Sequence, residues 1–589
     1  MNPIARFAGA LTLSVALCAA AVGTLPRTAD ASAGSAAGSA VDEVAQPETG
    51  RQFSVLGVAG APFADVVAAV EAAGGTVRDS NAVIGLVTAE ARSEGFTARL
   101  ARSGAVELVA AVRAIGRVPE LLPVALPSVH PEAVVRGEKP SPRPVGPAGD
   151  PLDVNLWGLT AINAAEAHKT ELGDRRVMVG ILDTGVDGTH PDIAPNFNAA
   201  LSRNFTTDIP VDPLGTELDG PCEVAGCKDP ADADDNGHGT HVAGTIAAAL
   251  DGFGLSGVAP GVQIVNVRGA QDSGLFFLQS VANAITYSAD IGIDVLNMSF
   301  YTDPWAALCV ANPADTAEQQ AEQKLILEGM ERAMAYADSK GVTQVVALGN
   351  ANQDPTAPHV DASSPNFPAN TAHPRLVDGT CKSMPAGDVH AIRVGAYGPS
   401  GNKAGFSNFG PSLSVAAPGG WFGDYAGTAQ GNQSENGILS ALPRSLALKQ
   451  GAIDTNGQLT KVGESNGVEA ACKASAGGSA GGSVCGYYHY LQGTSMAAPH
   501  AAGVAALIVS AYGKGKAAGF GLAPAQVRSV LEGTARGMAC PGPLVAFATY
   551  QAACAGDTSF NTFYGHGSVD AFAAVTAGAP LMAAYNRED

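Results

Sequence analysis

Three short segments of the chain place a carboxylate, an imidazole and a hydroxyl at sharp turns or helix starts. Asp183 stands in LDTGVDGTHPD, His238 in NGHGTHVAGT, and Ser495 in GTSMAAPHAAG. A hydroxyl that can pass its proton to an imidazole becomes a nucleophile, and a carboxylate behind that ring stabilises the imidazolium that forms. These residue types therefore predict acyl-transfer chemistry, provided that the fold brings them together.

Each residue also has an ordinary structural interpretation. An Asp after a strand is commonly a turn or cap residue, and a Ser before a helix is commonly an N-cap. His238 and His241 can share one face of a helix, where they could be packed or could bind a metal. Taken singly, none of these residues defines a site, so the elements that carry them decide the question.

Short apolar runs alternate with helical patterns from about residue 154 onward. The runs at 177–182, 262–267, 293–298 and 344–348 are continuous, as in strands buried on both faces. Helical spacing appears at 238–250, 276–289 and 325–341. This alternation predicts an α/β fold with a mostly parallel sheet and helices on both faces. Asp183 directly follows the first run, at the carboxyl end where such sheets carry functional groups.

The three motifs together, in the order Asp, His, Ser, resemble the subtilisin-like serine peptidases. The resemblance runs from about residue 157 to 575. It implies that Ser495 is the nucleophile, that His238 is the general base and later acid, and that Asp183 orients His238. The family also uses an Asn after a sheet strand to bind the oxyanion, and QVVALGNAN supplies Asn350 at that place, with the backbone N–H of Ser495 as a second donor.

The same resemblance implies substrate contacts. The segment VLNMSFYTDPW aligns with the family strand that lines the first substrate pocket, so we expect Ser299, Phe300, Tyr301 and Gly349 to bind substrate. Tyr301 stands where a Gly is usual, which leaves the primary specificity open. Long segments at about 302–325, 353–388 and 421–487 depart from the common pattern. They are lids or exosites, or else structural decoration, the default for long loops.

The resemblance implies no cofactor for the chemistry, although calcium is common in the family. Asp187, Asp192 and the loop DPADADDN offer the oxygen ligands that calcium prefers. Acidic loops are also often simply solvated, so the sequence assigns no ligand.

Composition supports a globular, acidic protein. At 589 residues the chain exceeds one hydrophobic core, and 46% of its residues are hydrophobic against 15% charged. A net charge of -21 argues against nucleic acid as a partner, because such binding needs clustered Lys and Arg. We expect a monomer that acts on proteins or peptides.

The first 31 residues have the pattern of a signal peptide. An apolar run at 7–22 precedes Ala29-Asp30-Ala31, a small-x-small cleavage pattern. A membrane anchor is the alternative, but 16 residues are short for a span. A lipoprotein site at Cys18 is disfavoured because bulky Leu17 precedes it. We found no other run of spanning length, so we expect a secreted protein without membrane contact.

Three further regions follow the signal peptide. Residues 52–120 predict a small α+β domain, with strands at 53–58 and 82–87, a helix at 62–75 and a mostly helical segment at 94–112. A Pro-rich stretch at 121–153 predicts a linker or processing region. The peptidase domain would span 154–580. The α+β domain has the position of the family's propeptide, which aids folding and occludes the active-site cleft. The alternative is a permanent accessory domain.

Eight cysteines remain once Cys18 is removed with the signal peptide. Eight allow 105 pairings. Their spacings favour Cys222 with Cys227, Cys472 with Cys485, and Cys540 with Cys554, which leaves Cys309 with Cys381. Zinc ligation is disfavoured because no CxxC pair occurs.

Three other classes of protein fit the sequence less well. An aspartic peptidase could use Asp183 and Asp272, but that fold is nearly all β and leaves the His and Ser motifs unexplained. An α/β-hydrolase needs GxSxG with its Ser first in the chain. A secreted binding protein on an inactive scaffold would usually lack one of the four catalytic groups, and all four are present here.

Overall fold

The computed structural model describes residues 51–92, 95–111, 114–117, 143–211, 217–300, 304–366, 371–474, 483–516, 519–541, 545–547 and 550–585. The predicted signal peptide, most of the predicted linker and Tyr301 lie outside these residues.

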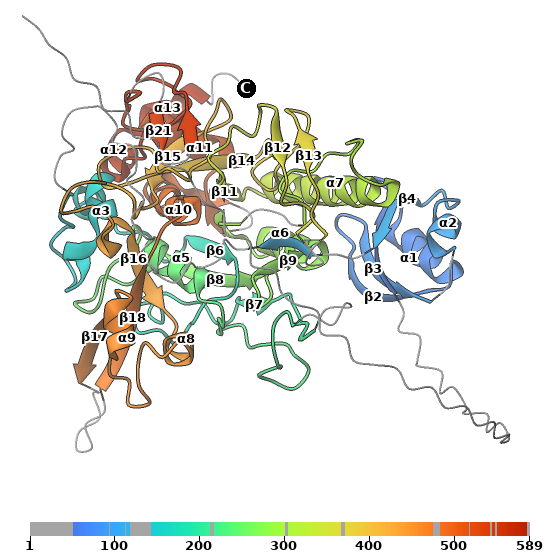
Figure 1. Ribbon diagram of the computed structural model, residues 1–589, viewed down its shortest axis with the longest axis horizontal. Coiled ribbons are helices and arrows are strands. Elements are labelled where there is room, and N and C mark those ends of the chain that lie inside the picture. The colour runs from blue at the N-terminus through green and yellow to red at the C-terminus, as the bar shows by residue number, and fades with distance from the viewer. Residues whose placement is uncertain are drawn as a thin grey trace, which may run out of the picture. The chain divides into compact units, whose positions relative to one another are not determined.

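A seven-stranded sheet forms the centre of the chain from about residue 154 onward (Figure 1). Its strand order is β15-β14-β11-β10-β6-β8-β7, and each neighbouring pair is parallel. The strands are β6 (Met178–Leu182), β7 (Arg203–Asn204), β8 (Gln263–Arg268), β10 (Val295–Met298), β11 (Thr343–Ala347), β14 (Ala391–Tyr397) and β15 (Val415–Pro418). The predicted parallel sheet is therefore confirmed.

Register brings the ends of the strands to one edge. Met298 of β10 lies opposite Leu182 of β6, so the residues that follow these strands, Ser299 and Asp183, emerge together. This edge is the place where parallel sheets present functional groups.

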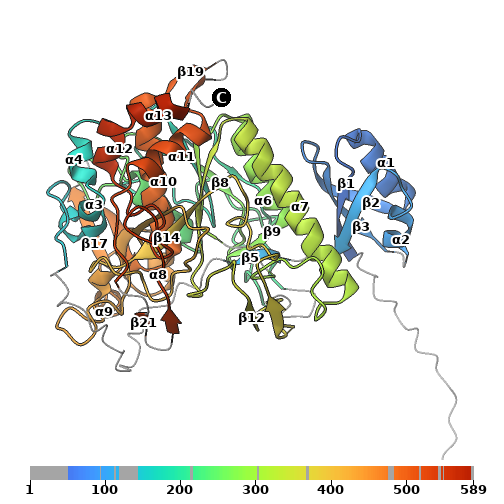
Figure 2. The same ribbon diagram turned by 90° about the horizontal axis from the view of Figure 1, so that it is seen from above.

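Helices cover both faces of the sheet (Figure 2). Val345 of β11 lies in the hydrophobic core formed with α5 (His238–Ala247) and α10 (Thr494–Tyr512). The opposite core, with α6 (Leu278–Asp290) and α7 (Ala317–Ser339), takes Val346. Successive side chains of one strand thus enter different cores, and both faces of the sheet are buried. The strand sequences are therefore continuously apolar.

Two helices differ from the expectation. Helix α7 begins before the predicted residue 325, because Thr316 and Gln319 form a capping box at its start. Helix α10 is long and apolar enough to cross a membrane. This differs from the expectation that no segment after the N-terminal apolar run has that length and hydropathy. The most apolar window of α10 is 89% buried in the protein, as expected of a core helix.

The N-terminal part forms its own antiparallel sheet in the order β2-β3-β1-β4. Its elements are β1 (Arg51–Gly57), α1 (Phe63–Ala72), β2 (Gly75–Asn81), β3 (Leu86–Ala91), α2 (Phe96–Leu100) and β4 (Val106–Ala111). The predicted helix at 94–112 is thus mostly wrong. Its second half pairs with β1 as a strand, because sheet hydrogen bonds on that edge outweigh the helix propensity of Glu, Leu and Ala.

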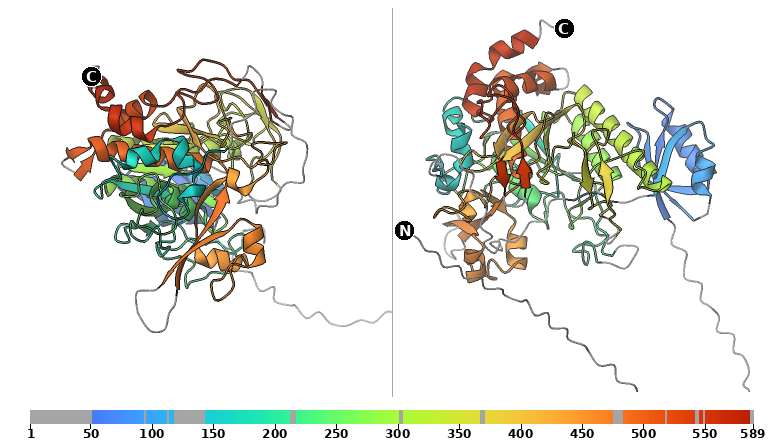
Figure 3. Two further views of the ribbon diagram at one scale, coloured as in Figure 1. Left: turned by 90° about the vertical axis from the view of Figure 1, so that its left-hand side faces the viewer. Right: turned by 45° about the horizontal axis from the view of Figure 1, so that its top comes forward.

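The three long segments have their own structure. The first and second are joined by the Cys309–Cys381 disulfide. The second carries the hairpin β12 (His359–Asp361) and β13 (Arg375–Val377). The third builds a small sheet beside the main one, orange in Figures 1 and 3, from β16 (Ile438–Leu442), β17 (Glu469–Ala474) and β18 (Ser483–Leu491). All four predicted disulfides are present.

The remaining elements are short. They are β5 (Ala114–Arg117), η1 (Asp153–Asn155), α3 (Trp157–Ala161), α4 (Ala164–His168), β9 (Leu275–Phe277), η2 (Ser434–Asn436), α8 (Arg444–Lys449), α9 (Lys461–Ser465), β19 (Lys514–Lys516), β20 (Gly519–Gly521), α11 (Pro524–Gly533), β21 (Val545–Phe547), β22 (Tyr550–Ala552), α12 (Ala571–Ala577) and α13 (Ala579–Tyr585).

Candidate active site

Asp183 and His238 form a buried pair. Asp183 follows β6, and His238 is the first residue of α5, after Gly237, whose φ of +94° favours glycine. The Nδ1 atom of His238 lies 2.7 Å from Oδ1 of Asp183, and the two side chains are 2% and 0% exposed. The bond orients the ring, and Nε2 of His238 has no hydrogen-bond partner among the described residues.

Ser495 lies in the first turn of α10, which is fastened to the end of β10. The Ser495 hydroxyl donates to the carbonyl oxygen of Ser299 (3.0 Å), and the Ser299 hydroxyl donates to the carbonyl oxygen of Ser495 (3.0 Å). The Asn297 side chain holds Ser299 in turn. Within the described residues no hydrogen bond joins Ser495 to His238. Such bonds are often absent from enzymes without substrate.

Asn350 follows β11 and is fixed by the residue before Ser495. Its Oδ1 accepts from the backbone N–H of Thr494 (2.9 Å) and from the Thr494 hydroxyl (2.8 Å). Because Oδ1 faces a backbone donor, the amide NH₂ must point the other way. Gly349 has φ +115°, and a Cβ there would lie 2.5 Å from the side chain of Asn408. The Asn350 amide is therefore a preset donor beside Ser495.

Comparison with known proteins identifies the family of this chain. A family model described as "Subtilase family" matches residues 174–567. The chain belongs to the subtilase family. The match confirms the resemblance to this family of serine peptidases and the predicted fold class.

Among curated relatives of this subtilase, fervidolysin of Fervidobacterium pennivorans is 30% identical over 66% of the chain and 41% of the relative. The chain thus spans less than half of fervidolysin. Subtilisin BL of Lederbergia lenta is also 30% identical, over 45% of the chain and 71% of the relative.

Two solved structures share the fold. The epidermin leader peptide processing serine protease from Staphylococcus aureus gives a TM-score of 0.58 at 20% identity and covers 89% of this chain and 97% of its own. The crystal structure of fervidolysin gives 0.52 at 24% identity and covers 90% of this chain and 61% of its own.

Sequence reasoning offered Asp234 only as one carboxylate of the loop DPADADDN and missed that it links the Asp183 loop to the start of α5. Its Oδ1 accepts from the Thr184 hydroxyl (3.0 Å) and the Gly237 N–H (2.9 Å). Its Oδ2 accepts from the N–H and the hydroxyl of Thr240 (2.9 and 2.6 Å). An Asp just before an Asn-Gly break and a helix start was the available signal, since such residues cap helices.

The expected substrate residues divide into three groups. Gly349 lines, with Asn350, a pocket of about 680 Å³. Ser299 is fully buried and fixes Ser495. The Phe300 ring stacks on Phe276 at 4.0 Å and is 2% exposed, so this side chain belongs to the core. Tyr301 lies outside the described residues, and its effect on the pocket stays a prediction.

His241 is a packed histidine. Its Nε2 lies 3.0 and 3.2 Å from the carbonyl oxygens of Ile438 and His489, so this nitrogen carries the proton. Burial lowers the pKa of His241 well below its usual value. Burial, followed by the nearness of His238, lowers the pKa of His489 to about 4. The alternative that His241 binds a metal therefore has no support from its contacts.

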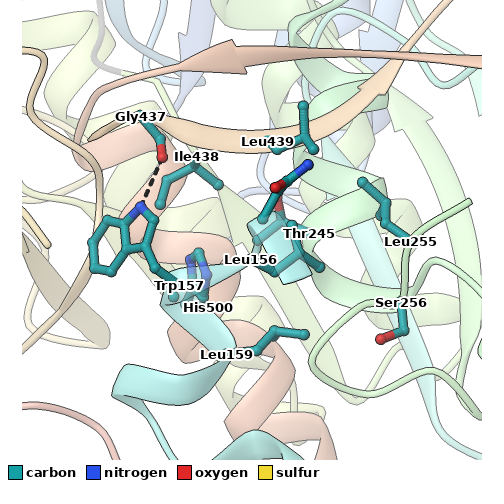
Figure 4. A pocket seen from close by; sticks show the side chains of 12 residues that line it. Leu156, Trp157, Leu159, Thr245, Leu255, Ser256, Gly437, Ile438, Leu439 and His500 are labelled. Carbon is teal, nitrogen blue, oxygen red and sulfur yellow. Dashed lines mark hydrogen bonds between the residues drawn. The ribbon is translucent and has the colours of Figure 1, made fainter. Parts of the chain in front are cut away.

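A separate cavity lies behind the site, between α3, α5, α10 and β16 (Figure 4). The side chains of Trp157 and His500 border it, and the Trp157 indole N–H donates to the Gly437 carbonyl oxygen (2.8 Å). The cavity volume is about 20 Å³. This is room for about one water molecule, so a peptide does not bind there.

One carboxylate of the loop DPADADDN, that of Asp229, belongs to an acidic cluster with Asp208 and Asp272, and a protein cation occupies this cluster. Asp208, Asp229 and Asp272 bring carboxylate oxygens within 4.8 Å of one another, but the Arg268 guanidinium lies among them, at 3.2, 2.7 and 2.7 Å. Burial raises the pKa of Asp208 to about 6 and that of Asp272 to about 7. A cation of the protein thus takes the place that a metal would need.

The other two candidates also make internal contacts. Asp187 accepts from the backbone and hydroxyl of Thr189. Asp192 accepts from the Leu255 N–H (2.9 Å) and the Tyr488 hydroxyl (2.7 Å), while its Oδ1 has no partner among the described residues. We assign no calcium ligand.

Proposed function

We propose that this subtilase is a secreted endopeptidase that hydrolyses peptide bonds through Ser495, His238 and Asp183. The observation that carries the proposal is the buried 2.7 Å bond between His238 and Asp183 at the sheet edge to which Ser495 is fastened. A buried carboxylate behind an imidazole is the arrangement that makes a neighbouring serine nucleophilic.

Acylation begins when the Ser495 hydroxyl turns from the Ser299 carbonyl towards Nε2 of His238. Its oxygen attacks the substrate carbonyl carbon, and its proton passes to Nε2. Asp183 remains ionised and stabilises the imidazolium. The developing oxyanion receives hydrogen bonds from the Asn350 amide and from the Ser495 N–H, which lies in the first turn of α10 and has no partner within the helix.

The leaving amine then takes the proton from His238, and the C–N bond breaks to leave an acyl-enzyme. Water repeats the sequence: His238 accepts a proton from water, the hydroxide attacks the ester, and Ser495 recovers its proton. No cofactor takes part in these steps.

We further propose that residues 52–120 are a propeptide that is removed on maturation. Its sheet packs on α6 and α7: the Asn81 amide donates to the Thr286 hydroxyl (2.7 Å), and the Arg332 guanidinium bonds Glu107 (2.7 Å). Burial supports a specific contact, because Leu86 shares a core with these two helices.

The end of this N-terminal part pairs with a short strand that follows β8. Strand β5 pairs antiparallel with β9, with Arg117 opposite Leu275. The segment that leads to β9 begins beside the site, since the N–H groups of Gly269 and Ala270 donate to the carbonyl oxygen of Asp183. The pairing supports our proposal that this part acts as an inhibitor until it is removed. Cleavage within the region 121–153 would release it.

Four disulfides and the N-terminal apolar run support an extracellular protein, because disulfides persist in oxidising compartments. We propose that the mature protein is a monomer whose partners are protein or peptide substrates.

Replacement of the nucleophile tests the proposal. Ser495→Ala should abolish peptide hydrolysis and self-processing, and a serine-directed phosphonyl fluoride should label Ser495 in the unaltered enzyme. The loss of about a millionfold is the value for subtilisin, a member of the same family, and is borrowed from it. Ser510→Ala is the control, because Ser510 lies on the same helix and contacts Ala506 and Asp174. Retention of more than about a tenth of the activity would remove Ser495 from the mechanism.

The N-terminus of the active enzyme tests the maturation proposal. We expect the N-terminal sequence of the active secreted form to begin within the region 121–153. An active form that starts near Ser32 would identify the N-terminal part as a permanent domain.

A further inference from the structure

Residues 349–353, the loop that carries Asn350, lie beyond the end of β11, and the strand pairing of β11 does not extend to their backbone groups. Such groups need other partners when they lie inside the protein. On the side of Ser495 the partner is Thr494, whose hydroxyl accepts from the Gly349 N–H (3.1 Å) and donates to Oδ1 of Asn350 (2.8 Å). The other backbone groups of the loop need a partner from a different segment.

One buried asparagine, Asn408, is that partner. Its Oδ1 accepts from the backbone N–H groups of Ala351 and Gln353, both at 3.0 Å. Its Nδ2 donates to the carbonyl oxygen of Leu348 (3.1 Å), and its backbone N–H donates to the carbonyl oxygen of Gly349 (2.9 Å). Asn408 therefore bonds the chain on both sides of the proposed oxyanion donor.

Asparagine suits this place for two reasons. One end of its planar amide accepts hydrogen bonds while the other end donates. An ionised carboxylate has no donor for the Leu348 carbonyl oxygen, and a hydroxyl has one oxygen in place of an oxygen and an NH₂. The amide also has room because Gly349 carries no side chain: a Cβ there would lie 2.5 Å from Nδ2 of Asn408.

The segment that carries Asn408 is itself fastened to the central sheet. The Ser407 hydroxyl accepts from the N–H of Ala396 in β14 (2.9 Å) and donates to the carbonyl oxygen of Asn408 (3.0 Å). Earlier in the same segment, the ammonium group of buried Lys403 donates to Oδ1 of Asn352 (2.7 Å). The loop at 349–353 thus has two supports from one segment that is tied to the sheet.

We propose that Asn408 is a positioning residue for the reaction: it fixes the loop so that the Asn350 amide stays where the oxyanion forms. The inference rests on the proposed function, in which Asn350 stabilises that oxyanion. Preset donors are effective because they need not move when the charge develops. A displacement near 1 Å lowers the rate by about a hundredfold. Loss of the support from Asn408 should therefore lower turnover and leave substrate binding nearly unchanged.

A double-mutant cycle tests this role, with kcat expressed per active site titrated with the serine-directed phosphonyl fluoride. We expect Asn408→Ala to lower kcat by about tenfold to a hundredfold and to change KM by less than about threefold, because the oxyanion contact forms in the transition state. In the Asn350→Ala background the same change should cost less than about threefold, because the donor that Asn408 positions is gone. Variants too slow to process themselves are processed by tagged unaltered enzyme, which is then removed.

Asn436→Ala is the matched control, because Asn436 is a buried asparagine whose amide supports a different loop through the carbonyl oxygens of Asp424 and Gln430. This change should shorten the half-life of activity on heating and leave kcat within about threefold in both backgrounds. If Asn408→Ala lowers kcat equally in both backgrounds, the inference is overturned, because Asn408 then acts on the enzyme as a whole and not through Asn350.

Asn408→Asp takes the place of Asn408→Ala in the cycle if the latter does not fold. It keeps the shape and the acceptor oxygen of the side chain, and when ionised it loses only the donor to Leu348. We expect kcat to fall at least about threefold in the unaltered background and to stay the same in the Asn350→Ala background. Failure of both variants to fold would also overturn the inference, since Asn408 would then be needed by the whole fold. Failure of the proposed function would look different: Asn350→Ala would not slow hydrolysis, or no peptide would be cleaved.

Discussion

Asp234→Asn tests whether one buried carboxylate positions the catalytic pair. Asp234 is 2% exposed, and each of its oxygens accepts a hydrogen bond from a backbone N–H of the α5 start, Gly237 at Oδ1 and Thr240 at Oδ2. An Asn side chain has one oxygen and one NH₂. In either orientation the NH₂ faces a buried backbone donor, which loses its acceptor.

The loss of one hydrogen bond to a charged acceptor costs about 1.5–3 kcal/mol. We therefore expect the free energy of unfolding to fall by about 2 kcal/mol and heat inactivation to become severalfold faster. The start of α5 carries His238, so we also expect kcat to fall by about tenfold to a hundredfold, the scale of a misplacement near 1 Å. KM should change little, because Asp234 is buried behind the site.

The assay is kcat and KM at 25 °C with active-site titration, together with the half-life of activity on heating. Asp187→Asn is the matched control, since Asp187 lies in the Asp183 loop and its side chain bonds only Thr189 among the described residues. If Asp234→Asn keeps kcat within twofold and the half-life of the unaltered enzyme, Asp234 does not position His238.

Three more outcomes follow from individual contacts. Asn350→Ala should lower kcat about a hundred- to thousandfold, a range borrowed from subtilisin itself, and an unchanged rate would remove Asn350 from the oxyanion site. Burial lowers the pKa of His500 to about 4 in the folded protein, against about 6.5 in the unfolded chain. Between about pH 6.5 and pH 4 the unfolded chain therefore binds more protons than the folded protein. The free energy of unfolding consequently falls as the pH drops from about 6.5 to about 4. His500→Leu should make the free energy of unfolding fall less between pH 7 and pH 4, by at most about 3 kcal/mol, as measured by urea unfolding at each pH. If the variant and the unaltered enzyme lose stability equally over this pH range, His500 is not the group responsible. Arg268→Met should lower the free energy of unfolding by about 3–5 kcal/mol, because it leaves two buried carboxylates and one partly buried carboxylate without their cation. A loss below about 1 kcal/mol in urea unfolding would show that Arg268 does not neutralise them.

Local patterns predicted much of this protein. The four neighbouring strands β11, β10, β6 and β8, the start of α5 and the three closely spaced disulfide pairs are each encoded by a few neighbouring residues or by spacing. Motifs around Asp183, His238 and Ser495 identified the family because their order and context recur together.

Contacts between distant segments were not predictable in this way. Residues 106–111 have the composition of a helix, and only the free edge of β1 makes them a strand. The side chain of Phe300 packs against Phe276, a contact that comes from a distant segment of the chain and that no local pattern predicted. The acidic loop at 229–236 suggested calcium, but Arg268 comes from a strand more than thirty residues away.

The sequence by itself determined which groups can do chemistry, because residue type and helix or strand start are local properties. The tertiary structure alone decided how these groups are held: Asp234 between two segments, Asn350 on Thr494, and two long segments joined by the Cys309–Cys381 disulfide. The physical reason is that a hydrogen bond or a disulfide between segments depends on their packing, which no single segment encodes.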